Sequence, residues 1–337
     1  MRYRQVPGTD LRVSEVGFGV WTVASGWWGE YTDDQAVTLL RQAFDRGVTF
    51  FDTADTYGNG RGETLLAQAF PGADRDDIVI ASKFGYDWQS TLGQRRAGHE
   101  EAPHRLDVPF LEQALAGSLE RLGTDHIDLW QLHNVRMEHL QRDEVWTFLD
   151  KARRSGAVRA IGVALGPAIG WREEGIYSLT ERPVDVVHMI YNALELDPGR
   201  ELIAVARRAG RSLLVRVPHS SGMLEGHYDE QTTFAENDHR RHRPEAWLTG
   251  GLQKIQQLDF LTAGTGRTLG QAALRFVLHD PAVVSALPNI YELAQLDEFV
   301  GAAECADLTT ADVARIEALF ESNYGLPREQ EQAVVTR

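Results

Sequence analysis

The chain has 337 residues, of which 43% are hydrophobic and 25% are charged, the proportions of an ordinary folded protein. Its 49 acidic residues outnumber its 34 basic residues, and the net charge of −15 argues against binding to nucleic acid or an anionic membrane. The single cysteine, Cys305, excludes an internal disulfide and a cysteine-based metal cluster within one chain. Only three basic residues are lysines, so a lysine in an unusual place is informative.

The sequence shows no secretory signal and no membrane span that we can identify. The first residues contain no apolar segment of the kind found in secretory signals. No run approaches the roughly 18 apolar residues that a membrane span requires. We therefore expect a cytoplasmic protein that acts on a small molecule.

Short apolar runs alternate with amphipathic helical patterns from one end of the chain to the other. The first residues, Tyr3–Val6 and Leu11–Val13, predict a hairpin that closes the bottom of a barrel. The strands predicted after it are mostly continuous apolar runs, which is typical of parallel strands buried on both faces. They are Ser14–Gly19, Val48–Asp52, Ile78–Lys83, Ile127–His133, Arg159–Val163, Val184–Tyr191, Ser212–Val217 and Val283–Pro288.

Amphipathic helices are predicted between these strands. Thr32 and Gln35 form a capping box at the start of the first helix, and Gly47 is a plausible stop after its end. The predicted helices are Asp33–Arg46, Val108–Leu122, Arg142–Ser155, Gly199–Ala209, Thr268–His279 and Tyr291–Ala302, with a weaker one around Gly170–Leu179.

Eight strands that alternate with helices predict a single α/β domain over 1–337, a (β/α)8 barrel or TIM barrel. Long loops are expected after the third and seventh strands, at Phe84–Asp107 and His219–Gly251, and a loosely held tail over 322–337. A doubly wound sheet is the structural rival. It would carry a G-x-G-x-x-G turn after its first strand, whereas Gly17-Phe-Gly19 is followed by Val-Trp-Thr.

Three consecutive strands end in side chains that carry chemistry. The second predicted strand ends at Asp52 with Tyr57 just beyond, the third at Lys83 and the fourth at His133. Each residue taken alone is as well explained by packing or loop capping, but lysine is seldom buried unless it is paired. Because the active site of such a barrel lies at the carboxyl ends of the strands, we expect the four to converge.

These residue types suit proton transfer at a carbonyl oxygen. A tyrosine phenol has a reference pKa of about 10, too high for an efficient proton donor near neutral pH. An ammonium at ~4 Å supplies about 4 kcal/mol at an effective dielectric constant of ~20, so Lys83 is strong enough to activate Tyr57. Asp52 would keep the lysine charged, and His133 would orient the substrate oxygen. The matching hydride transfer requires a nicotinamide cofactor.

Four stretches resemble the aldo-keto reductase superfamily: Val16-Gly-Phe-Gly19, Gly47-Val-Thr-Phe-Phe-Asp-Thr-Ala-Asp-Thr-Tyr-Gly58, Ala81-Ser-Lys-Phe-Gly85 and Asp125-His-Ile-Asp-Leu-Trp-Gln-Leu-His133. The resemblance covers nearly the whole chain. It implies a (β/α)8 barrel that uses NAD(P)H, with Tyr57 as general acid/base, Lys83 and Asp52 tuning it, and His133 aligning the carbonyl.

The same resemblance implies a set of cofactor-binding positions, several of which depart from the family pattern. His188 stands where the family has Gln, and Arg216 stands where an aromatic commonly stacks on the nicotinamide. Ala164-Leu165 replaces the usual Ser-Asn. The positions carried over are Trp21, Asn134, His188, Arg216, Pro218, Ser221, Gly222, Leu224, Pro288, Asn289, Gln295 and Glu298.

The family's usual cofactor is NADP(H), but NAD(H) is a serious alternative. The stretch Pro288–Glu292 after the eighth strand contains no basic residue to pair with a 2′-phosphate, and Glu292 would repel one. Arg267 or the arginines within 240–243 would have to reach in from elsewhere.

The substrate pocket is expected to be lined by aromatic residues of the loops after the first and third strands, namely Trp27, Trp28, Tyr86 and Trp88. Such a lining suits a sugar face or an apolar carbonyl compound. Histidines in the seventh loop, His219, His227, His239 and His242, match no tight ligand spacing, so we predict no metal.

We therefore expect an oxidoreductase that interconverts a carbonyl and an alcohol on an aldehyde, ketone or sugar. Two alternatives remain open at this point. One is a redox-neutral sugar isomerase or lyase that uses bound cofactor internally, and the other is a non-catalytic regulatory subunit that binds the cofactor.

Overall fold

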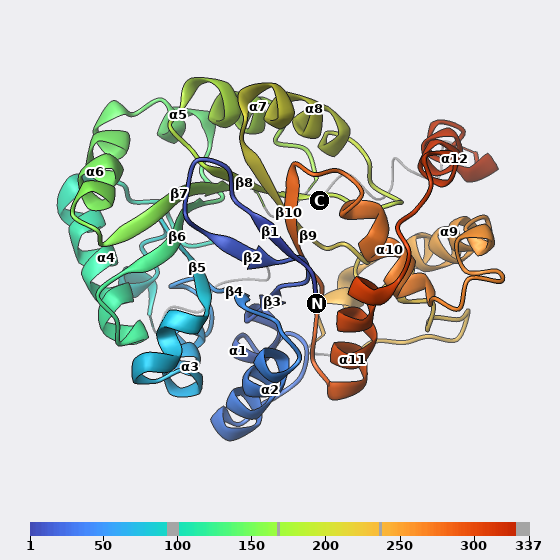
Figure 1. The fold of residues 1–337 in the computed structure, drawn as a ribbon, viewed down its shortest axis with the longest axis horizontal. Coiled ribbons are helices and arrows are strands. Elements are labelled where there is room, and N and C mark those ends of the chain that lie inside the picture. The colour runs from blue at the N-terminus through green and yellow to red at the C-terminus, as the bar shows by residue number, and fades with distance from the viewer. Residues whose placement is uncertain (93–100, 167–168, 236–237, 328–337) are drawn as a thin grey trace.

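Eight parallel strands stand at the centre of the molecule and helices surround them (Figure 1). The computed structural model describes residues 1–92, 101–166, 169–235 and 238–327. The strands pair in chain order from β3 to β10, and a parallel bridge between Val16 and Ala286 brings the first strand region against the last. The backbone N–H of Gly17 donates to Ala286 O at 2.9 Å. The sheet is thus a nearly closed (β/α)8 barrel, as predicted, and the doubly wound rival is wrong.

The barrel strands are β3 (Phe18–Gly19), β4 (Phe50–Asp52), β5 (Val79–Phe84), β6 (Ile127–His133), β7 (Val158–Ala164), β8 (Val186–Ile190), β9 (Ser212–Arg216) and β10 (Val283–Leu287). The helices are α1 (Trp21–Ala24), α2 (Asp33–Asp45), α3 (Arg61–Ala69), α4 (Val108–Leu122), α5 (Met137–Leu140), α6 (Asp143–Arg154), α7 (Arg172–Glu181), α8 (Gly199–Ala209), α9 (Glu245–Gln256), α10 (Leu269–Val277), α11 (Leu293–Gly301) and α12 (Thr310–Glu321).

The predicted helices and their caps agree with the structure within a few residues. Thr32 and Gln35 form the expected capping box on α2, and Gly47 follows the helix at a φ of 86°. Three longer helices were not predicted, namely α3, α9 and α12. The glycines at the start of α3 and in the middle of α9 weaken their helical signal, so packing rather than local propensity holds them.

A hairpin covers the end of the barrel where the strands begin (Figure 1). It consists of β1 (Tyr3–Gln5) and β2 (Arg12–Ser14), as predicted. Val6, Leu11 and Val13 of the hairpin pack against residues that fill the barrel interior, including Phe50 and Leu129. The interior is therefore a packed apolar core at this end, and only the opposite end is left for a site.

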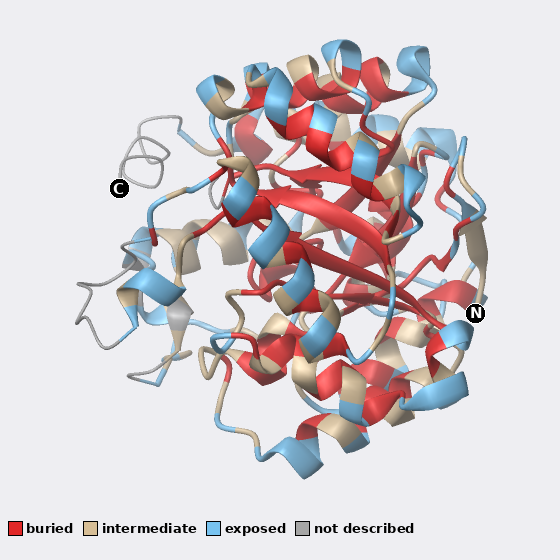
Figure 2. Ribbon diagram, turned by 90° about the vertical axis from the view of Figure 1, so that its left-hand side faces the viewer, coloured by how far each residue is buried: buried red, intermediate tan, exposed pale blue. Residues whose placement is uncertain are grey.

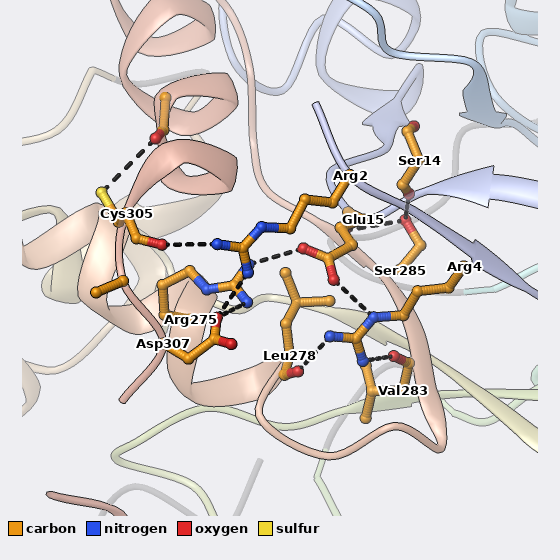
Figure 3. A network of polar contacts seen from close by, with 12 residues as sticks. Arg2, Arg4, Ser14, Glu15, Arg275, Leu278, Val283, Ser285, Cys305 and Asp307 are labelled. Atoms are coloured by element: carbon orange, nitrogen blue, oxygen red, sulfur yellow. Dashed lines mark hydrogen bonds and ion pairs between the residues drawn. The ribbon is translucent and has the colours of Figure 1, made fainter. Parts of the chain in front are cut away.

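A buried ionic network fastens the hairpin to the barrel (Figure 3). Arg275 of α10 is 2% exposed and donates to Glu15 at 2.7 Å. Arg4 of β1 donates to the same carboxylate at 2.7 Å and also reaches the backbone oxygen of Val283. Burial alone would raise the pKa of Glu15, but the two guanidinium groups outweigh it and hold that pKa below its usual value. This network connects the hairpin to α10 and β10.

The remaining core lies between the strands and the helices, where buried residues concentrate, while exposed residues lie on the outer helix faces (Figure 2). No helix among the described residues is long and apolar enough to cross a membrane. At the C-terminal end, Tyr324 is buried and its hydroxyl contacts the backbone oxygen of Ala193. The rest of the predicted tail, from 328 onward, lies outside the described residues.

Candidate active site

The carboxyl ends of the strands carry a layer of polar side chains on top of the apolar barrel core. Every second side chain of a strand points into the barrel. The next interior side chain after Phe50 is therefore Asp52, the next after Ala81 is Lys83, and the next after Leu129 is Gln131. All three polar residues are at least 96% buried. Because buried charges are costly unless paired, these side chains must satisfy one another.

Lys83 lies at the centre of this layer. Its Nζ donates to Asp52 Oδ1 at 2.5 Å, to the Thr53 backbone oxygen at 2.8 Å and to Tyr57 Oη at 3.1 Å. The three donors of the ammonium are thus fully used. Three of the four residues predicted from the strand ends are therefore in direct contact.

The electrostatics of this cluster favour a charged lysine. Burial by itself lowers the pKa of Lys83, but Asp52 and Tyr57 together raise it above its usual value. Burial also raises the pKa of Asp52, and the Lys83 charge opposes that rise. We take the pair as ionised, because the contact at 2.5 Å and the bond from Gln131 both favour the carboxylate.

His133, at the end of β6, stands beside Tyr57. The two rings meet edge to face, with centroids 5.9 Å apart. Burial, followed by the charges of Lys83 and Arg216, lowers the pKa of His133 well below its usual value. The imidazole is therefore neutral, and its buried Nδ1 has no hydrogen-bond partner among the described residues. A neutral imidazole can donate one hydrogen bond to a substrate oxygen without bringing a third cation into the site.

Gln131 belongs to the same cluster, although the sequence analysis did not single it out. Its Nε2 donates to Asp52 Oδ2 at 3.1 Å. Gly162 on the neighbouring strand β7 makes room for it, since a Cβ at that position would lie 2.7 Å from Gln131 Cγ. The period-two pattern Leu129, Gln131, His133 was the signal that would have placed this side chain inside the barrel.

Two of the residues at unusual cofactor positions also face the cluster. His188 on β8 is buried, its Nδ1 lies 3.8 Å from Asp52 Oδ2, and neither ring nitrogen has a partner among the described residues. Arg216 on β9 donates through Nη2 to the backbone oxygens of Leu165, at 2.9 Å, and Gly166. Burial lowers the pKa of His188 well below its usual value, so it is neutral.

The loop after β5 folds back over the mouth of the barrel. Tyr86 and His104 form an antiparallel bridge, and His104 Nε2 donates to the backbone oxygen of His133 at 2.8 Å. The Tyr86 ring packs edge to face on the His133 ring at 5.0 Å. Asn134 Nδ2 donates to Tyr86 Oη at 3.0 Å and to Glu101 Oε1 at 3.2 Å. The structure thus places Asn134, predicted at a cofactor position, beside the predicted substrate residue Tyr86.

The predicted pocket residue Trp88 belongs to the same loop and is half-buried. The Arg121 guanidinium of α4 lies 5.8 Å from the centre of its ring. Trp88 also hydrogen-bonds Asp55, a carboxyl whose pKa burial raises well above its usual value. Asp55 lies two residues before Tyr57, so this contact ties the loop to the segment that carries the phenol.

The loops after β3, β9 and β10 meet in an aromatic and cationic stack. Trp28 stacks on Tyr291 with ring centroids 5.7 Å apart, and the Arg240 guanidinium lies 4.3 Å from the Trp28 ring centre. Arg240 is itself held by both oxygens of Asp238, at 2.9 and 2.6 Å, and donates to Tyr228 Oη at 2.7 Å. Three loops that are far apart in the chain are thereby joined at one side of the mouth.

A buried carboxyl that was not predicted lies beneath this stack. Glu225 is 6% exposed and accepts from Gln295 Nε2 at 3.0 Å, while its Oε1 has no hydrogen-bond partner among the described residues. Burial raises the pKa of Glu225 to about 7, and the nearby Glu298 and Glu292 add to the rise. Glu298 itself contacts Thr268 Oγ1 at 2.5 Å.

The other predicted cofactor and pocket residues surround the same mouth or pack below it. Trp21 meets Trp28 edge to face at 6.1 Å, and Ser221 Oγ accepts from Arg243 Nη2 at 3.1 Å. Pro218, Pro288 and Leu224 are buried, with Leu224 fully inside the core. Gly222 takes a φ of 94°, and a Cβ there would meet the Tyr228 hydroxyl. Trp27 and Asn289 are half-buried.

The two histidines of the seventh loop whose side chains are described, His219 and His227, lie in different environments. His219 is buried and bonded to the Gly270 backbone oxygen, whereas the His227 side chain is 67% exposed. The side chains of His239 and His242 lie outside the described residues. In the described part of the chain, no three His, Cys, Asp or Glu residues come together as metal ligands.

The family model described as the Aldo/keto reductase family matches residues 15–321. Among curated proteins, aldo-keto reductase YhdN of Bacillus subtilis is 27% identical, over 88% of this chain and 87% of its own length. The aldo-keto reductase yakc [NADP(+)] of Schizosaccharomyces pombe is 27% identical, over 91% and 88%. The NADH-specific methylglyoxal reductase of Escherichia coli is 25% identical, over 93% and 97%.

Among solved structures, the holo form of aldo-keto reductase AKR11C1 from Bacillus halodurans superposes with a TM-score of 0.74. It is 25% identical, and the match covers 95% of this chain and 96% of that one. The sequence and structural matches therefore both extend over nearly the whole chain.

Proposed function

The chain belongs to the aldo/keto reductase family, and from this premise we propose that it is an NAD(P)H-dependent oxidoreductase that interconverts a carbonyl and an alcohol, with Tyr57 as general acid/base. The observation that carries the proposal is the contact of Tyr57 Oη with the buried ammonium of Lys83 at 3.1 Å. An adjacent cation stabilises the phenolate that remains when the phenol gives up its proton.

The residues at the barrel mouth fit a nicotinamide cofactor. Both ring nitrogens of His188 are buried and have no hydrogen-bond partner in the part of the chain that the structure describes, and an amide group can satisfy them. Arg243 lies against Ser221 in a turn where Ser220, Ser221 and Gly222 all have positive φ values. A cation therefore lies at two of the predicted cofactor positions, where it could pair with a phosphate of the cofactor. When bound, the nicotinamide supplies or accepts the hydride.

The protein's own residues handle the proton. In reduction, Tyr57 donates its proton to the carbonyl oxygen, and in alcohol oxidation the phenolate takes the proton back. Lys83 holds the phenolate charge, while Asp52 and Gln131 keep the ammonium in place. The neutral imidazole of His133 donates a hydrogen bond to the same substrate oxygen and orients the carbonyl beside Tyr57.

Within this function we propose that NAD(H) is preferred over NADP(H). Glu292 is exposed next to Tyr291. Two further carboxyl groups, those of Glu225 and Glu298, lie nearby. Two of the arginines named above as candidates for a 2′-phosphate are already engaged. Arg240 bonds Asp238 and Tyr228. Arg267 bonds the backbone oxygens of Leu261 and Ala306. A dianionic 2′-phosphate beside Tyr291 would therefore meet carboxylates, and Arg240 and Arg267 would have to give up their present contacts to bind it.

Two measurements test these proposals. Quenching of tryptophan fluorescence during titration gives the affinity for NADH and for NADPH, and NADH is expected to bind more tightly. Tyr57→Phe is expected to bind the cofactor normally but to lose at least 1,000-fold of the rate of carbonyl reduction, on the order of the transition-state stabilisation that proton transfer provides. A fully active Tyr57→Phe protein contradicts the mechanism, and tight NADPH with weak NADH binding contradicts the preference. Substrate conversion without net NADH change would point instead to a redox-neutral isomerase.

A further inference from the structure

Tyr86 and Asn134 form a hydrogen-bonded pair beside His133. Among the described residues, Glu101 is the only acidic side chain that hydrogen-bonds this pair. Its Oε1 accepts from Asn134 Nδ2 at 3.2 Å, and it also hydrogen-bonds the Tyr86 hydroxyl. Asn134 Nδ2 in turn donates to Tyr86 Oη at 3.0 Å. These three residues come from the loop after β5 and from the first position after β6, so the fold rather than chain proximity assembles them.

The proton arrangement in this group requires Glu101 to act as an acceptor. The Asn134 amide donates one proton to the Tyr86 oxygen and one to Glu101, which leaves the phenol proton for the carboxylate. Burial, followed by the bond to Glu101, raises the pKa of Tyr86 above its usual range, so it remains a phenol. The two protein donors use two of the roughly four acceptor positions of a carboxylate. The described residues supply no further donor to Glu101, so the remaining positions can accept from donors that enter the mouth.

The surroundings hold this acceptor at a fixed place. The loop is folded back by the Tyr86–His104 bridge and by backbone bonds from Asp87 N to Pro103 O and from Arg105 N to Gly85 O, both at 2.8 Å. Tyr86 and Asn134 are buried, whereas Glu101 is exposed. The carboxylate therefore lies at the solvent end of a hydrogen-bonded polar group whose inner end, Tyr86, packs on His133.

We propose that Glu101 is a specificity-determining residue that selects carbonyl substrates with a neutral hydroxyl group remote from the reacting carbon and disfavours substrates with a carboxylate or phosphate there. The inference rests on the proposed function, because it assumes that the carbonyl is held between Tyr57 and His133. A substrate hydroxyl donates to the remaining acceptor positions, while a substrate anion is repelled by the carboxylate charge.

The test compares wild type with Glu101→Gln on matched substrates. Glutamine keeps an oxygen that accepts from Asn134 and Tyr86, so the loop stays fastened while the charge is removed. The substrate pairs are glyceraldehyde with propanal, which lacks the hydroxyls, and succinic semialdehyde with butanal, which lacks the carboxylate. Turnover of propanal and butanal also shows that each variant is folded.

Wild type is expected to favour glyceraldehyde over propanal in kcat/KM, and Glu101→Gln to reduce that ratio about tenfold, mainly through KM. The variant should also raise the kcat/KM of succinic semialdehyde relative to butanal. Glu112→Gln, which neutralises an exposed acid on α4, should leave both ratios unchanged. Ratios for Glu101→Gln within twofold of wild type would overturn this inference alone, because a purely fastening role leaves selectivity intact. Failure of wild type to reduce any of the four aldehydes would overturn the proposed function, and the inference with it.

Discussion

Lys83 Nζ lies 2.5 Å from Asp52 Oδ1 inside the barrel, where neither side chain is more than 5% exposed. The two residues lie on adjacent strands, β5 and β4, and each would be costly to bury alone. The same ammonium also reaches the Tyr57 hydroxyl at 3.1 Å. The ion pair therefore does two things: it makes a buried charge tolerable, and it keeps that charge beside the phenol.

Lys83→Met should reduce both activity and stability. The variant leaves the Asp52 carboxyl buried without its cation, which costs about 3–5 kcal/mol of the free energy of unfolding. Activity should fall by at least 100-fold, because Tyr57 loses the charge that stabilises its phenolate. Urea denaturation and steady-state reduction of an aldehyde measure the two effects.

The double variant Lys83→Met/Asp52→Asn is the control for this prediction. It should recover much of the lost stability, since no charge is left unpaired, yet it should remain inactive. If the double variant is less stable than Lys83→Met, the buried pair is not the source of the effect.

Gly162→Ala should disturb the site without touching a predicted catalytic residue. The added methyl would lie 2.7 Å from Gln131 Cγ, and Gln131 must then move away from Asp52. Overpacking of this kind costs about 1–3 kcal/mol of stability, and we expect kcat to fall severalfold. Gly250→Ala on α9 is the matched control, because a Cβ there meets nothing within 4 Å, and in a helix it should be neutral or stabilising. Equal effects of the two substitutions would contradict the explanation.

Glu292→Arg should shift the cofactor preference toward NADPH. The change removes a carboxylate beside Tyr291 and supplies a guanidinium, which binds phosphate in a bidentate manner. We expect NADPH affinity to rise about tenfold in fluorescence titrations and NADH affinity to change little. Because the gain is electrostatic, it should shrink as salt is added. Glu304→Arg introduces the same charge at an exposed position outside the mouth, and it should not reproduce the effect. An unchanged NADPH affinity in Glu292→Arg would show that the 2′-phosphate lies elsewhere.

Glu225→Gln should change the pH dependence of stability. Burial raises the pKa of Glu225 in the folded protein to about 7, from an ordinary value of 4.5. Between those pH values the folded state holds more protons than the unfolded state, so this carboxyl lowers stability progressively as the pH rises from about 4.5 to about 7. The variant should match wild type near pH 4.5 and be more stable by ~3 kcal/mol at pH 8. A stability difference that does not vary with pH between 4.5 and 8 would contradict this assignment.

Much of the fold could be read from the sequence because the signals are local. Parallel strands buried on both faces produce continuous apolar runs, and helix caps such as Thr32 with Gln35 depend on residues three apart. The helix α3 was missed because glycines begin it, while its stability comes from tertiary contacts of Glu63. That side chain is fully buried, bonded to Ser82 on β5 at 2.5 Å and to Arg121 on α4 at 2.7 Å.

The candidate site, like the fold, could be predicted from the sequence only in part. Asp52, Lys83 and His133 each end a strand, and the carboxyl ends of parallel strands meet on one face, so the sequence alone determined that they would converge. Only the tertiary structure decided which further atoms join them. The pairing of the strands brings Gln131 to Asp52. Arg216 donates to the backbone oxygen of Leu165, 51 positions away in the chain, and Glu101 accepts from Asn134, 33 positions away. Apolar periodicity specifies which face of a strand is buried, whereas polar contacts between distant side chains depend on strand register and loop closure, which no local pattern encodes.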